Sequence, residues 1–237
     1  MSHAASGWAT ATGPRPDNQD RCAAAGGWAL VSDGAGGHQG GGLAATLSVE
    51  AAASVLVRAV DPDPDTVSAA IAAAHDAVAA RQATGPDVSD MAATLTVAVA
   101  EARTGAWLVG NVGDSPAWRI GADRIDHLTE DHNAAAALVR AGAISLDEAR
   151  THPGRHMITQ AVGSRERPAA ALSRVTPRPG DRLVLATDGM AVLPEAAIME
   201  VVLAAPTPDA AAHALVEAAL AAGTRDNVTV VVLVPAR

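Results

Sequence analysis

Short runs of apolar residues, alternating or continuous, recur along the chain between turn-forming residues, and this pattern predicts many β-strands. Runs of about four to eight such residues bounded by Gly, Pro, Asp or Asn are typical of strands. The expected strands are residues 7–12, 28–32, 92–99, 106–112, 116–120, 124–128, 172–176, 182–187 and 228–234.

Other segments carry a helical period. Residues 43–60 should bury one face, made of Leu43, Leu47, Ala51, Ser54 and Val55. Asp63 suits the N-cap of the next helix and Pro64 its first position. The apolar stripe of that helix is Val67, Ile71, Ala74 and Val78. Residues 133–150 are again helical in character, and a last helix is expected over 207–223, with Thr207 as its cap and Pro208 at its first position.

Strand blocks interleaved with two pairs of helices predict an α+β layered sandwich. The chain shows no linker, no low-complexity segment and no repeat of fixed period, so we expect residues 1–237 to form a single domain.

Charge and composition narrow the function classes. The 237 residues carry 17 basic and 26 acidic groups, a net charge of −9, without a basic patch, which argues against a nucleic-acid-binding protein. The single cysteine, Cys22, excludes a disulfide scaffold and suits a reducing compartment. Met1–Ala4 do not begin a secretory signal, and the apolar run 228–234 is too short to cross a bilayer. We therefore expect a cytoplasmic protein.

Aspartates stand at the ends of four predicted strands. They are Asp33, Asp114, Asp188 and Asp226, and Gly follows two of them. Each alone is compatible with an ordinary solvated turn. Four carboxylates brought to one end of a sheet structure would repel one another unless cations lie between them, and an oxygen-only ligand set favours Mg²⁺ or Mn²⁺.

Such a site would suit phosphoester hydrolysis. Gly34 follows Asp33 and, lacking a Cβ, could bring its carbonyl oxygen to an ion. Two divalent ions sharing a carboxylate would lower the pKa of a bridging water and generate the nucleophile for in-line attack on phosphorus. Arg15 lies in a polar loop and is the candidate for holding phosphate oxygens, although the same pattern fits a surface arginine.

The chain resembles the metal-dependent Ser/Thr protein phosphatases of the type-2C class, in their short bacterial form. Eight motifs carry the resemblance in family order, from about residue 10 to residue 234. They are Arg15 with Asn18-Gln19-Asp20, Val31-Ser32-Asp33-Gly34-Ala35-Gly36-Gly37-His38, Met91-Ala92-Ala93-Thr94-Leu95, Gly110-Asn111-Val112-Gly113-Asp114-Ser115, Leu128-Thr129-Glu130-Asp131-His132, Ile158-Thr159-Gln160-Ala161-Val162-Gly163, Ala186-Thr187-Asp188-Gly189 and Asp226-Asn227-Val228-Thr229.

The resemblance implies a four-layer αββα sandwich of two antiparallel sheets flanked by helix pairs, with a flap at about 133–165 that influences substrate choice. It implies that Asp33 bridges two Mn²⁺ or Mg²⁺ ions and that the Gly34 carbonyl binds the first of them. Asp188 and Asp226 would complete the second site, and Arg15 would contact phosphate. Asp20 would act near the first ion, and Asp114 would help to hold a third.

The implied activity is hydrolysis of phosphoserine and phosphothreonine in proteins, by a water or hydroxide bridging the two ions. The expected partners are substrates of bacterial Ser/Thr kinases, and the expected state is a monomer. The alternative is a non-catalytic phosphoprotein-binding or partner-switching regulator on the same fold, and a small-molecule phosphomonoesterase stays open.

Three positions depart from the family pattern. Ala35 stands where some members have a His proposed as the general acid, so the leaving-group proton would have to come from water or another group. Pro116 stands where Arg is usual, and Gln19 where some members have Glu. None of these changes removes an implied direct metal ligand. The chain also lacks a P-loop, a Gly-x-Ser-x-Gly elbow and the phosphate loop of cysteine phosphatases.

Overall fold

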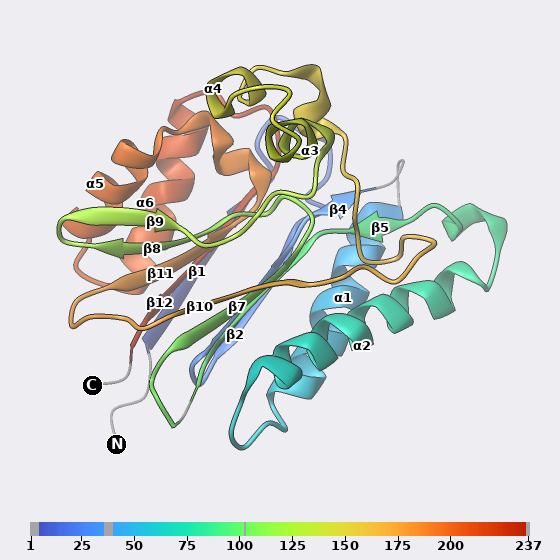
Figure 1. Cartoon of the computed structure of the whole chain (residues 1–237), viewed down its shortest axis with the longest axis horizontal. Coiled ribbons are helices and arrows are strands. Elements are labelled where there is room, and N and C mark those ends of the chain that lie inside the picture. Colours follow the sequence, from blue (N-terminus) through green and yellow to red (C-terminus); the bar gives the residue numbers. More distant parts are fainter. Residues whose placement is uncertain (1–4, 36–39, 102, 236–237) are drawn as a thin grey trace.

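The computed structural model describes residues 5–35, 40–101 and 103–235, and it shows two antiparallel sheets packed face to face between helices (Figure 1). Met1–Ala4 and the motif residues Gly36, Gly37 and His38 lie outside the described residues. The arrangement confirms the predicted α+β sandwich with four layers.

One sheet has the strand order β1-β12-β11-β8-β9. Its strands are β1 (Ala5–Ala11), β12 (Val228–Val234), β11 (Arg182–Ala186), β8 (Ala117–Gly121) and β9 (Arg124–His127). The helices α5 (Glu195–Ala204) and α6 (Pro208–Ala221) cover its outer face. Thr207 caps α6 by accepting a hydrogen bond from the backbone N–H of Ala210, as the Thr-Pro pair predicted.

The second sheet has the order β10-β7-β6-β3-β2. Its strands are β10 (Ala171–Val175), β7 (Trp107–Val112), β6 (Leu95–Ala100), β3 (Trp28–Ser32) and β2 (Arg21–Ala25), and its outer face carries α1 (Gly40–Leu56) and α2 (Pro64–Gln82). Asp63 caps α2 within a capping box, and the predicted stripe Val67, Ile71, Ala74 and Val78 is buried.

The remaining elements are short. They are β4 (Gly34–Ala35), β5 (Ala92–Ala93), α3 (Ala134–Arg140), α4 (Leu146–Ala149) and the 3₁₀ turns η1 (Pro86–Val88), η2 (Pro153–His156) and η3 (Asp188–Val192). The helices α3 and α4 lie together at the end of the molecule drawn uppermost in Figure 1. None of the helices among the described residues is long and apolar enough to cross a membrane.

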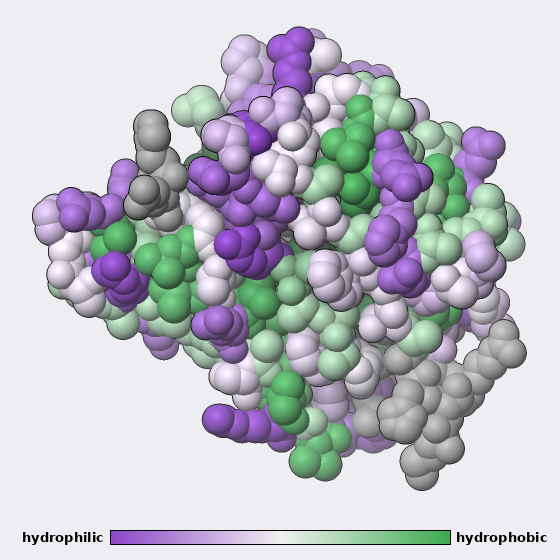
Figure 2. All heavy atoms as spheres, turned by 180° about the vertical axis from the view of Figure 1, so that it is seen from behind, coloured by the Kyte–Doolittle hydropathy of each residue, from purple (hydrophilic) through white to green (hydrophobic). Residues whose placement is uncertain are grey.

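Small side chains let the two sheets approach closely. The core between them contains Ala29 and Ala98 from one sheet and Ala117, Leu185 and Val231 from the other, all fully buried. A further apolar cluster lies between each sheet and the two helices on its outer face. From behind, hydrophilic residues gather in a band through the upper middle of the surface, while hydrophobic residues appear in separate small groups (Figure 2). Ala, Val and Leu thus fill most of the core, in a sequence in which only 2% of the residues are aromatic.

Two expectations about elements were wrong, and two elements were not predicted. The face that α1 buries is formed by Ala45, Ser48 and Ala52, because small residues let α1 pack against α2; Ser54, expected to be buried, is exposed. The expected helix over 133–150 divides into α3 and α4 around Gly142, whose φ of 69° is left-handed. The strand β2 and the helix α5 were not predicted, because both are alanine-rich and carry little periodicity.

Candidate active site

Antiparallel pairing brings the predicted aspartates to one end of the sandwich. Asp20 precedes β2 and Asp33 follows β3, and these strands pair so that Arg21 faces Ser32. Asp114 lies at the same edge, because β7 is the second neighbour of β3 and runs in the same direction. In the other sheet, Asp188 follows β11 and Asp226 precedes β12, with Ala186 paired to Val230. Each sheet therefore contributes carboxylates to one cluster.

The carboxylates are close enough to change one another's ionisation. Burial raises the pKa of Asp33 well above its ordinary value, and the charges of Asp20, Asp188, Asp226 and Asp114 raise it further. Burial also raises the pKa of Asp188, and the charge of Asp226 raises it further. The repulsion among these carboxylates would be relieved by a cation lying between them.

Asp20 is the most enclosed member of this cluster. Its side chain is only 3% exposed, and Oδ2 accepts a hydrogen bond of 2.8 Å from the Thr187 hydroxyl. Burial raises the pKa of Asp20 to about 7, with Asp188 and Asp226 adding to the effect and the hydroxyls of Thr187 and Thr229 opposing it. The Thr187–Asp20 bond joins the two sheets directly.

A buried polar network positions Asp33 and the loop before Asp114. The backbone N–H of Asp33 donates to Thr94 Oγ1 at 2.9 Å, and Thr94 Oγ1 lies 2.7 Å from Ser115 Oγ. Thr96 donates to the Ser115 carbonyl at 2.6 Å, and Asn111 donates to the Gly113 carbonyl at 3.0 Å. The network explains why three polar residues of two family motifs, Thr94, Asn111 and Ser115, are buried.

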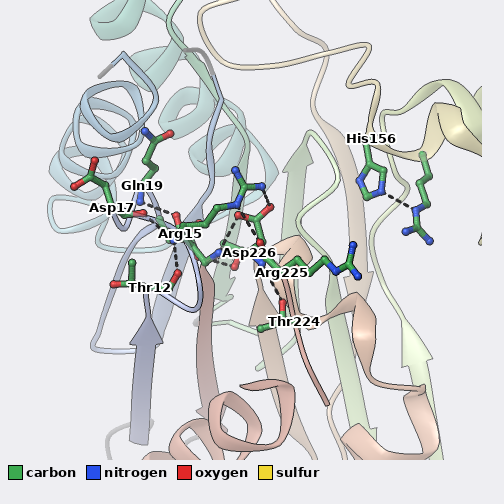
Figure 3. Close-up of polar contacts among 12 residues, drawn as sticks. Thr12, Arg15, Asp17, Gln19, His156, Thr224, Arg225 and Asp226 are labelled. Atoms are coloured by element: carbon green, nitrogen blue, oxygen red, sulfur yellow. Dashed lines mark hydrogen bonds and ion pairs between the residues drawn. The ribbon is translucent and has the colours of Figure 1, made fainter. Parts of the chain in front are cut away.

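Arg15 lies against Asp226 at the mouth of the cluster (Figure 3). Its Nη2 donates to Asp226 Oδ2 at 2.7 Å and its Nε donates to the Arg225 carbonyl at 3.0 Å. The Arg15 side chain is 54% exposed. The pairing holds the guanidinium at the cluster while Nη1 and one Nη2 proton stay available to a ligand, which fits the predicted contact with phosphate.

The glycines beside the aspartates are required by packing. A Cβ on Gly34 would lie 2.3 Å from the carbonyl carbon and oxygen of Gly41 in the first turn of α1. A Cβ on Gly189 would lie 2.0 Å from the carbonyl oxygen of Asn227. The sequence argument attributed Gly34 to the approach of an ion, whereas the structure shows that contact with α1 already demands glycine there. The Gly34 carbonyl as a metal ligand stays a prediction.

The donor set fits divalent cations that prefer oxygen. One carboxylate oxygen each of Asp20 and Asp188 (Oδ1 in both) is buried without a hydrogen-bond partner in the described part of the chain. Buried carboxylate oxygens of this kind are costly unless a cation or donor reaches them. In the same residues no three His, Cys, Asp or Glu side chains are already drawn together as a formed metal site. The chemistry of this donor set suits Mn²⁺ or Mg²⁺.

Asp114 has a partner that the sequence reasoning did not single out. Burial raises the pKa of Asp114 to about 7, followed by the charges of Asp188 and Asp131. Burial also raises the pKa of Asp131, whose carboxylate accepts a hydrogen bond of 3.3 Å from Asn133. Asp131 and His132 were quoted only as motif residues. His132 is buried, and its Nδ1 accepts a hydrogen bond of 3.2 Å from the Gly113 N–H.

His156 of η2 also faces the cluster. A positive charge on His156 would lower the pKa of Asp188, although burial dominates and raises it. In Figure 3 His156 lies across from Arg225 and Asp226, and its Nε2 accepts a hydrogen bond of 2.8 Å from Arg155.

Known bacterial phosphatases are similar in sequence to part of this chain. The chain is 31% identical to the serine/threonine phosphatase stp of Listeria innocua over 53% of its own length and 50% of the relative's. It is 35% identical to the serine/threonine protein phosphatase PstP of Mycobacterium tuberculosis over 52% of its own length and 24% of the relative's. The chain therefore matches about half of the first relative and a quarter of the second.

Solved structures match over nearly the whole chain. The PPM Ser-Thr phosphatase MsPP from Mycobacterium smegmatis, in complex with cacodylate, has a TM-score of 0.87 and 36% identity, covering 98% of this chain and 99% of that one. The catalytic domain of PstP in complex with two manganese ions has a TM-score of 0.88 and 28% identity, with complete coverage of both chains. A family model described as protein phosphatase 2C matches residues 14–221. The fold, the clustered carboxylates and this match together show that the chain belongs to the protein phosphatase 2C family.

Proposed function

We propose that this protein hydrolyses phosphoserine and phosphothreonine in other proteins in a reaction that depends on Mn²⁺ or Mg²⁺. The observation that carries the proposal is the mutual elevation of carboxylate pKa values across two sheets, with buried oxygens of Asp20 and Asp188 left without partners. Buried carboxylates that repel one another are costly unless a cation balances their charge, so this cluster is expected to bind cations. The manganese complex of the related PstP domain supports the same assignment.

The proposed ligands are the residues of this cluster. Asp33 would bridge two ions, the Gly34 carbonyl and Asp20 would serve the first, and Asp188 and Asp226 would serve the second. Asp114 would help to hold a third ion together with Asp188. Two such cations, when bound, lower the pKa of a shared water toward neutrality and so supply the nucleophile.

The protein's own groups bind and orient the substrate. Arg15 would hold two phosphate oxygens through its free donors, while its bonds to Asp226 and the Arg225 carbonyl keep the guanidinium from turning away. Thr94 fixes the backbone of Asp33, and Thr187 fixes the carboxylate of Asp20. Fixed ligands and a fixed phosphate clamp place the reacting groups in line without rearrangement.

Three finer features belong to the same proposal. We infer a single catalytic domain whose segment 133–165 acts as a flap, because Asn111 and Gly113 bond to residues 130 and 132 at its base. We infer phosphorylated proteins as partners, with no nucleic acid or membrane, since the net charge is −9. We also infer a cytoplasmic monomer, a location that the single cysteine favours.

Metal-dependent turnover tests the proposal. Purified protein would be assayed on a phosphothreonine peptide and on an aryl phosphate, with Mn²⁺, with chelator, and as Asp33→Asn and Asp188→Asn. We expect turnover with Mn²⁺, its loss with chelator and a large loss in both variants. Asp123→Asn, an exposed carboxylate in the turn between β8 and β9, is the matched control and should keep full activity.

Two results would contradict the proposal. Turnover that ignores chelator, or full activity in both Asn variants, would rule out the metal mechanism. Binding of the phosphopeptide without turnover under any metal condition would favour the non-catalytic regulator instead. Retention of Asp33, Asp188 and Asp226 argues against that regulator, because a binding module does not require the metal ligands.

A further inference from the structure

Arg225 lies directly before the candidate ligand Asp226, and its side chain is not used by the mechanism above. The guanidinium is exposed and makes no hydrogen bond or ion pair with any part of the chain that the structure describes. Figure 3 shows it extending from the Asp226 loop toward the side of the site on which His156 lies, while Asp17 points the other way. An unpaired arginine at the mouth of a site is available to a substrate.

The backbone that carries Arg225 is held firmly. The Arg225 carbonyl accepts a hydrogen bond of 3.0 Å from Arg15 Nε, and the Asp226 N–H lies 3.4 Å from Thr224 Oγ1. Asn227 then ties the segment to the N-terminal loop, donating to the Thr12 carbonyl at 2.8 Å and accepting from the Gln19 N–H at 2.8 Å. The base of the side chain is therefore fixed and its charged end is free.

The position of Arg225 relative to Arg15 determines which part of a substrate it meets. Arg15 and Asp226 mark where the scissile phosphate would bind, and Arg225 is the neighbour of Asp226 in sequence. An extended peptide advances about 3.5 Å per residue. Because the Arg225 side chain extends away from Asp226 toward the side on which His156 lies, it can meet a residue next to the phosphorylated one.

The charges around Arg225 determine which kind of substrate side chain is attracted next to the phosphorylated residue. Asp226 is already neutralised by Arg15, and Arg155 and His156 lie on the facing η2. The exposed guanidinium groups of Arg225 and Arg155 therefore lie on this side of the site. A carboxylate would be attracted there and an arginine or lysine would be repelled.

We propose that Arg225 is a specificity residue that binds an acidic side chain flanking the phosphoserine or phosphothreonine of the substrate. This inference rests on the proposed phosphatase function and adds a substrate class to it. The contact is a solvent-exposed ion pair at the rim, so its contribution is modest and decreases with salt.

The test compares two phosphothreonine peptides that differ only by Asp or Asn at the flanking positions. Exposed ion pairs of this kind correspond to about two- to five-fold in kcat/KM, so the wild type should prefer the Asp peptide by that factor at low salt. Arg225→Ala should bring the ratio to about one, and Arg225→Glu should invert it. Because each variant is compared with itself on two peptides, a general change in activity does not affect the readout.

Arg58→Ala is the matched control. Arg58 is an exposed arginine beyond the C-terminal end of α1, whose first turn contacts Gly34, so the length of the helix separates it from the site. This variant should keep the wild-type ratio. An unchanged ratio in both Arg225 variants, or an equal change in Arg58→Ala, would overturn the proposal. Absence of turnover of both peptides by the Mn²⁺-loaded wild type would instead overturn the phosphatase function, and this inference with it.

Discussion

Replacing Asp20 by Asn should stabilise the metal-free protein, although it removes a candidate active-site residue. Burial raises the pKa of Asp20 from 3.8 to about 7, so the folded protein holds this proton more tightly than the unfolded chain. Between these two values the folded state binds more protons, and the free energy of unfolding therefore falls as pH rises from about 4 to about 7.

The expected magnitude follows from that rise. At about 1.4 kcal/mol per pH unit, a rise of about three units costs the folded protein about 4 kcal/mol once Asp20 is ionised. Asn is never ionised and still offers an oxygen to the Thr187 hydroxyl. Asp20→Asn should thus raise the free energy of unfolding at pH 8 by up to about 4 kcal/mol, with a difference near zero at pH 4.

Urea unfolding in the presence of a chelator, followed by tryptophan fluorescence at pH 4, 6 and 8, measures this difference. Asp123→Asn provides the control at an exposed turn and should stay within about 0.5 kcal/mol of wild type at each pH. Added Mn²⁺ should stabilise the wild type at pH 8 more than it stabilises Asp20→Asn. A wild type that becomes more stable between pH 4 and pH 7 under chelation, or an Asp20→Asn protein that is less stable at pH 8, would refute the reasoning.

Three further changes have defined outcomes. Arg15→Ala should lower kcat/KM for phosphoesters by about 10- to 100-fold, the equivalent of a charge-assisted contact, with Mn²⁺ affinity measured in parallel to detect any effect through Asp226. Thr187→Val should raise the pKa of Asp20 further and move the pH midpoint of Mn²⁺ binding upward, as measured by calorimetry; an unmoved midpoint would contradict the assigned hydrogen bond. Gly189→Ala should lower the urea midpoint markedly, because its Cβ would meet the Asn227 carbonyl at 2.0 Å; a wild-type midpoint would show that the backbone can shift freely there.

The sequence allowed the convergence of the aspartates to be predicted because their positions follow from strand ends. An aspartate after β11 and one before β12 must meet once those strands pair, and the aspartates after β3 and β7 lie at one edge because these strands run in the same direction. The caps at Asp63 and Thr207 were predictable for a similar reason, since capping depends on a few adjacent residues.

Features that depend on contacts between distant segments were not predictable. The ion pair of Arg15 with Asp226 joins residues 211 positions apart, and no local pattern encodes it. The requirement for glycine at position 34 comes from the path of α1, which places Gly41 against it. The buried face of α1 was mispredicted because in an alanine-rich helix the packing partner, rather than hydrophobicity, decides which side is covered.

The pairing of β1 with β12 has a consequence for when the protein becomes competent during its synthesis. The hydroxyls of Thr10 and Thr229 lie 2.7 Å apart although 219 positions separate them, and β12 lies between β1 and β11 in its sheet. Asp226 and the Asn227 side chain, which organises the loop around Asp17 and Gln19, are made just before that strand. A nascent chain can fold the layer of α1 and α2 on its sheet early, but the site stays incomplete until β12 has emerged and inserted between its neighbours. Such non-local closure is slow, so catalytic competence should appear as a late event in folding.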